Sequence, residues 1–220
     1  MSWMKKIVVV AVAAAYACSA QTTISNSGVR TELWAPPKID WQEKDFPPTV
    51  PQEMIGTLLV ANLPIILEST TLEDVHKRLG GTIGVSGDPA KSDSWLCFVG
   101  KDTGGSWIFW LTSHVAQGPA IAGFQWRRLA INEIPDRRCR LLKESDGGIE
   151  LPLGLYPGMS EGEARKVLGD PSLIHGEILV FECRHQETRN DVPHTLDNTI
   201  AIVIHDGLVV AIQVWKATSS

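Results

Sequence analysis

The chain has 220 residues, of which 44% are hydrophobic and 20% are charged, so it can bury a sizeable core. This composition excludes a disordered or fibrous chain. The formal net charge of −5 argues against a nucleic-acid-binding protein, because such proteins need an excess of cations to bind phosphate.

Residues 1–20 have the pattern of an export signal. Lys5 and Lys6 form a positively charged start, and residues 7–17 form an uncharged apolar stretch followed by small residues. That stretch is too short to cross a bilayer, and no later segment approaches the roughly 18 apolar residues of a membrane helix. We therefore expect no transmembrane helix in the mature chain. The expected location is the periplasm or the periplasmic face of the outer membrane, with secretion as an alternative.

Cys18 follows Ala15-Tyr16-Ala17, which resembles a degenerate lipobox. Cys18 is therefore a candidate lipidation site that would give the protein a single lipid anchor. Cleavage between Ala20 and Gln21 is an alternative that the sequence leaves open. Removal of residues 1–20 leaves 18 basic and 25 acidic residues, a formal charge of −7.

Residues 21–55 are expected to form an extended leader. This range contains five prolines, at positions 36, 37, 47, 48 and 51, and no sustained apolar periodicity. It also contains Trp34 and Trp41. We interpret it as a tether between the signal and the folded body.

The rest of the chain divides into two similar segments, 56–130 and 131–220. A helix is expected over 71–80 in the first and over 160–169 in the second, and both end in Leu-Gly, a common helix stop. Each helix begins with a candidate capping box, in which a hydroxyl and a carboxylate three residues later satisfy free amide groups. The two pairs are Thr71 with Asp74, and Ser160 with Glu163.

Strand-like runs follow each expected helix. They cover residues 94–99, 106–112, 120–127, 178–184, 199–205 and 208–215. Asp206-Gly207 between the last two predicts a tight hairpin. The expected fold class is α+β, with two tandem units that each pack short helices on one face of an antiparallel sheet.

The second segment resembles the SmpA/OmlA outer-membrane lipoproteins. The resemblance is carried by Gly158-Met159-Ser160, then Ala164, Val167 and Leu168-Gly169-Asp170-Pro171. In the first segment only the capped helix and Leu79-Gly80 correspond. A tandem version of this unit is similar to the secreted β-lactamase inhibitory proteins, whose concave sheet binds a partner enzyme. The resemblance implies a protein-binding module at the cell envelope.

Three cysteines, Cys97, Cys139 and Cys183, survive either cleavage. One disulfide and one free thiol is the simplest arrangement in an oxidising compartment, and Cys139, in the connecting segment, is the more movable partner. The alternative is that all three are buried thiols. The pairing is not fixed by the sequence.

Period-two alternation leaves large side chains on the sheet face away from the helices. Either Trp107 or Trp110 must point to this open face, because they differ by an odd number of positions. An open face with large side chains indicates a binding surface, and tryptophan and arginine dominate interface energetics. The expected partner-binding residues are Trp107, Trp110, Gln125, Arg127, Gln213 and Trp215.

The competing class is a periplasmic hydrolase that would use His185, His194 or His205. Cys183 and His185 would share a strand face, but no closely spaced ligand pair predicts a metal site. A local basic stretch from Arg127 to Lys143 would either steer an acidic partner or form a solvated connector.

No catalytic residue, metal or cofactor is expected from the motifs present. The expected function is binding of another envelope or secreted protein through the open sheet face, as an outer-membrane assembly accessory or as a protein inhibitor.

Overall fold

The computed structural model describes residues 31–39, 55–88, 92–189 and 191–219. The expected signal at 1–20, with Cys18, and Trp41 of the leader lie outside the described residues.

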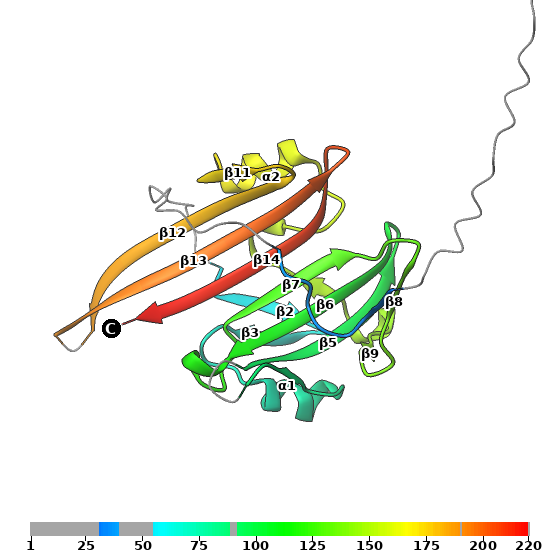
Figure 1. Cartoon of the computed structure of the whole chain (residues 1–220), viewed down its shortest axis with the longest axis horizontal. Helices are drawn as coiled ribbons and strands as arrows, with labels where there is room; N and C mark the ends of the chain where they lie inside the picture. The colour runs from blue at the N-terminus through cyan, green and yellow to red at the C-terminus, as the bar shows by residue number, and fades with distance from the viewer. Residues whose placement is uncertain (1–30, 40–54, 89–91, 190, 220) are drawn as a thin grey trace, which may run out of the picture.

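One large sheet dominates the described part of the chain, and its strands follow the order β11-β12-β13-β14-β7-β6-β5-β4 (Figure 1). Every pairing along this path is antiparallel. The bounds are β4 Gly84–Ser86, β5 Asp93–Asp102, β6 Gly105–His114, β7 Gly123–Arg128, β11 Leu173–His175, β12 Ile178–Arg189, β13 Val192–His205 and β14 Leu208–Ser219. The six strand-like runs and the Asp206-Gly207 hairpin are thus confirmed, with both turn residues at positive φ.

The two halves of the chain meet where β7 pairs with β14. Gln125 lies opposite Gln213 in this pairing. Gly123 is required here, because a Cβ at this position would lie 2.4 Å from the carbonyl oxygen of Val214. The pairing satisfies backbone N–H and C=O groups that each strand would otherwise expose at a sheet edge.

Two short helices begin as the sequence predicts. Helices α1 (Leu72–Leu79) and α2 (Glu161–Leu168) both have complete capping boxes and a glycine at the C-cap. The Thr71 hydroxyl accepts the Asp74 amide at 3.1 Å, and the Ser160 hydroxyl accepts the Glu163 amide at 3.2 Å. These bonds satisfy amide groups that a helix start leaves free.

Smaller elements surround the large sheet. Strands β2 (Thr57–Val60) and β3 (Leu63–Ile66) form a hairpin that β10 (Ile149–Glu150) extends, and β9 (Arg140–Leu141) runs parallel to β5. In the described ranges, 3₁₀ helices cover Val115–Gln117, Glu144–Asp146 and Pro152–Gly154.

A single main core joins both halves. It contains Leu72 and Val75 of α1, Ala164 and Leu168 of α2, residues of the β2–β3 hairpin, and side chains from β5, β6, β7, β12, β13 and β14. We call the sheet face that lines this core the inner face. Both helices are thus buried in one core that the two halves share.

The predicted fold class is therefore wrong. The described residues are mostly strand with two eight-residue helices, and they do not form two tandem units that each pack helices on a separate sheet. The sequence pattern correctly marks both α-helices and the six longer strands, but not the shorter strands, such as β2–β4 and β9–β11. It carries no information on whether the last strand of one half ends as a free edge or pairs with the other half.

A segment from the expected leader lies across the other, outer face of the sheet. This segment, residues 31–39, is named the strap, and it begins with β1 (Thr31–Leu33), which pairs in parallel with β8 (Glu133–Pro135). In Figure 1 the strap is the blue segment that crosses in front of β5–β7, while β2 and β3 lie behind the sheet.

Candidate functional site

The two tryptophans of β6 point to opposite faces. Trp107 lies in the main core, 5% exposed, with its ring edge against Trp126. Trp110 points to the outer face, where it joins a second apolar cluster with Trp95 and Ile108. Trp107 therefore does not belong to the expected binding face.

Trp110 is fully buried because the strap covers it. The Trp110 Nε1 donates a hydrogen bond to the carbonyl oxygen of Trp34 at 2.9 Å. The Trp34 ring packs edge-on to Trp95, with 5.7 Å between ring centroids, and the Arg138 guanidinium lies over it at 4.2 Å. Hydrogen bonding, aromatic packing and a cation–π contact thus hold the strap on the sheet.

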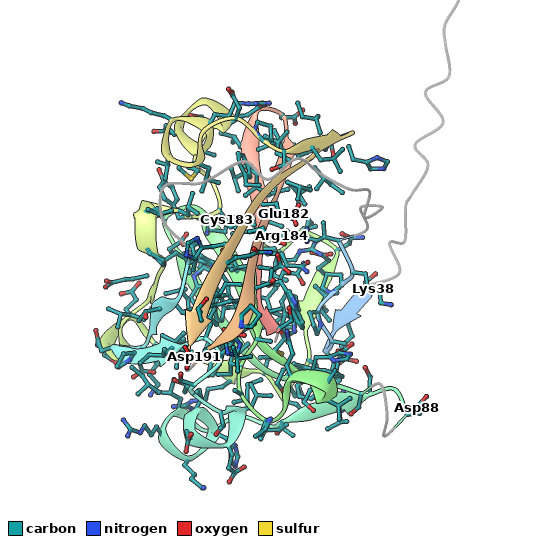
Figure 2. All side chains as sticks on the ribbon, turned by 90° about the vertical axis from the view of Figure 1, so that its left-hand side faces the viewer. Lys38, Asp88, Glu182, Cys183, Arg184 and Asp191 are labelled. Atoms are coloured by element: carbon teal, nitrogen blue, oxygen red, sulfur yellow. A yellow bond between two sulfur atoms is a disulfide. The ribbon has the colours of Figure 1, made fainter. Side chains whose placement is uncertain are left out.

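A disulfide between Cys97 and Cys139 ties the connecting segment to β5 under the strap. The thiol of Cys183 is free and buried, and this burial raises its pKa. Cys183 lies midway along β12, between Glu182 and Arg184 (Figure 2). The expectation of one disulfide that includes Cys139 and one free thiol is confirmed, and the alternative of three thiols is wrong.

A cavity of about 410 Å³ opens beside the strap on the outer face. The strap forms one wall, and β4–β7 and β14 form the floor and the other wall. Its lining includes Pro36, Pro37, Lys38, Ile39, Ser86, Asp93, Trp95, Thr112, Gln125, Gln213 and Trp215. Concave, mostly apolar cavities with a few polar groups are the usual form of a ligand site.

Gln125 and Gln213 project into this cavity from paired positions on β7 and β14. Gln125 is only 3% exposed, and Gln213 is half-buried. Within the described part of the chain neither side-chain amide makes a hydrogen bond, although a buried amide normally has a partner. Each amide offers both a donor and an acceptor.

Trp215 forms part of the cavity wall on β14. It is half-buried, and its ring packs edge-on to His114 with 6.4 Å between centroids. The Nε2 of His114 lies 3.8 Å from Asp93, which also lines the cavity. Three of the expected residues, Gln125, Gln213 and Trp215, are therefore brought together here.

Arg127 has a different role. Its guanidinium makes two hydrogen bonds to the Glu133 carboxylate, at 2.7 and 2.8 Å, and so ties β7 to β8. Arg128 bonds Asp102 and the carbonyl of Pro157, and Arg138 bonds Asp136. Three of the six basic residues are therefore engaged in internal pairs, and Arg127 and Arg128 lie part-buried on β7 instead of in a solvated connector.

The histidines of the hydrolase alternative do not share a site. His194 and His205 lie near opposite ends of β13, about 35 Å apart at the usual strand rise. His185 pairs opposite Leu196, near His194, whereas His205 contacts Glu177, which raises its pKa. Within the described residues no group of three His, Cys, Asp or Glu side chains is placed to hold a metal ion.

Sequence reasoning missed the strap. Trp34 and the prolines at 36 and 37 lie in a range with no periodicity, so strand and helix templates do not detect them. The available signal was a tryptophan next to a proline pair, since a large apolar ring in a polar leader is costly to expose. Neither described α-helix has the length and apolar character needed to cross a membrane.

Comparisons with family models, with curated proteins and with solved structures find no match for this chain. The resemblance to the SmpA/OmlA lipoproteins therefore rests on the motif residues alone and stays a prediction.

Proposed function

We propose that this chain binds another envelope or secreted protein through the cavity between the strap and β14. The observation that carries the proposal is the amide of Gln125, which is nearly buried, has no hydrogen-bond partner within the described residues and lines a mostly apolar cavity. A ligand that enters the cavity and hydrogen-bonds this amide would satisfy a donor and an acceptor that the protein itself leaves without a partner.

The binding face is smaller than the sequence suggests. The strap occupies the part of the outer face over Trp110, and Trp107 lies in the core. What is left for a partner is the region around Gln125, Gln213 and Trp215. Interface energy usually concentrates in such a small central group that includes an aromatic ring.

The expected location of the protein in the cell envelope supports this role. The expected export signal would place the chain in an oxidising compartment, and the Cys97–Cys139 disulfide is the form that such a compartment favours. Assembly accessory and inhibitor remain two variants of the same proposed binding function.

A photo-crosslinking amino acid at Ser86 tests the proposal in the cells that make the protein. Ser86 is exposed and lines the cavity, so an adduct with a second protein is expected from this position. The matched control is the same amino acid at Val85, the next residue of β4, which is 63% exposed and points to the opposite side of the strand. Absence of an adduct from Ser86, or equal adducts from both positions, would contradict the proposal.

A further inference from the structure

The strap shows what kind of ligand the outer face accepts. It is an extended segment that presents a backbone carbonyl to the Trp110 indole and a tryptophan ring to Trp95. The sheet thus already holds one extended peptide segment of its own chain by a backbone hydrogen bond together with aromatic packing.

The adjoining cavity has the same two features without an occupant from the described chain. Trp215 and the prolines of the strap provide apolar walls, and Gln125 and Gln213 provide unpartnered amides. A glutamine side chain matches a peptide group, because each has one carbonyl acceptor and N–H donors in one plane. A peptide backbone in the cavity would therefore pair with these amides as donor and acceptor together.

A positive charge on the cavity lining favours a ligand with an acidic group. Lys38 of the strap is exposed, lines the cavity and makes no ion pair within the described residues. Asp93 also lines the cavity, but its carboxylate lies beside His114, 3.8 Å from the Nε2 of that side chain, and it forms no ion pair with Lys38. An acidic side chain near Lys38 would find the complementary charge that Lys38 lacks.

We propose that the cavity recognises an extended, apolar peptide segment of the partner that carries an acidic residue, with its backbone bound by Gln125 and Gln213. This inference rests on the proposed protein-binding function and specifies the partner's chemistry. The shape of the ligand follows from the strap, and its charge follows from Lys38.

The test uses the purified full chain and a display library of linear nine-residue peptides as the probe. Wild type is expected to enrich apolar peptides that contain Asp or Glu. Those peptides are expected to bind at least tenfold more weakly to Gln125→Leu, and to lose their acidic preference on Lys38→Glu. Gln125→Leu removes an unpartnered buried amide and is expected to stay folded, which a melting curve checks.

Three results would overturn the inference. The first is no enrichment above a blank surface, and the second is equal binding of the selected peptides to wild type and Gln125→Leu. The third is Gln125-dependent binding of an N-acetylglucosamine tetramer in place of the peptides. If peptides fail while the Ser86 adduct forms, the partner is bound as a folded surface and only this inference falls; if the adduct is also absent, the proposed function falls.

Discussion

Several side chains have a polar atom without a hydrogen-bond partner, and they differ in whether that atom is sealed from solvent. The Nε1 of Trp95, the Nε1 of Trp126 and the Oδ1 of Asn198 are sealed from solvent and have no hydrogen-bond partner. Gln125 differs from them because its amide is not sealed and lines a cavity large enough for a ligand; Trp95 lines the same cavity with its ring, but its Nε1 is sealed. We therefore treat Gln125 as a binding group and the other three as local costs of packing.

Gln125→Met is expected to stabilise the protein while it weakens binding. Methionine fills a similar volume and removes an amide that has no protein partner; because this amide reaches the cavity and is not sealed, the expected gain is at most about 1 kcal/mol. Urea unfolding monitored by circular dichroism would measure the gain. Gln186→Met, at an exposed position on β12, is the control and is expected to change stability by less than about 0.5 kcal/mol. A clear loss of stability in Gln125→Met would show that the amide has a structural role.

Asp136 gives a prediction about pH. Hydrogen bonds from the Arg138 side chain and backbone lower the pKa of Asp136 from its ordinary value of 3.8 to about 2. Because the pKa is lower in the folded state, the stabilisation is present above about pH 4 and is lost as the pH falls from 3.8 to 2.

The unfolding free energy of wild type and Asp136→Asn should therefore differ at pH 7 and converge by about pH 2. Urea titrations at several pH values measure this difference. Arg138→Gln is expected to show the same convergence, since it removes the other member of the pair. A difference that stays constant over this pH range would contradict the assignment.

At the scale of elements, the strap depends on the segment that the disulfide holds in place. The Sγ of Cys139 lies 3.9 Å from the carbonyl oxygen of Leu33, and the amide of Asp136 donates to the same carbonyl at 3.0 Å. Arg138, between these two residues, covers the Trp34 ring. The Cys97–Cys139 bond thus fixes a segment that makes three kinds of contact with the strap.

Reduction of the disulfide is expected to destabilise the protein by about 2–4 kcal/mol, because the bond closes a long loop, with a sequence separation of 42. Urea unfolding with and without a thiol reductant measures the change. Cys183→Ser serves as the control, since Cys183 is not in a disulfide. The reductant should lower the unfolding free energy of this variant by the same amount as that of wild type. A reductant effect that disappears in Cys183→Ser would contradict the pairing.

The whole molecule is expected to unfold as one unit, because both halves share a sheet and a core. The tryptophans make this testable. Of the six described tryptophans, Trp215 alone lies in the second half, so fluorescence reports mainly on the strap and β5–β7, whereas far-ultraviolet circular dichroism reports on all strands.

The two signals should give the same urea midpoint within error. Trp215→Phe is a useful control, because its fluorescence then arises from the first half alone and its midpoint should still match that of circular dichroism. Separate midpoints would show that the two halves fold independently in spite of the shared sheet.

The sequence by itself determined the local elements and their chemistry. Capping boxes, Leu-Gly stops, alternation and the Asp206-Gly207 turn are interactions between residues close in the chain, so the pattern contains all the information they need. For the same reason Gln125, Gln213 and Trp215 were assigned correctly to one sheet face.

The tertiary structure decided everything that depends on distant partners. The pairing of β7 with β14 turned two expected sheets into one, the strap removed Trp110 from the open face, and Glu133 engaged Arg127. In each case a strand or side chain could contact several other segments whose local sequence patterns are similar. The contact that forms is the one that buries apolar side chains together and completes the backbone hydrogen bonds, and both depend on more than one segment.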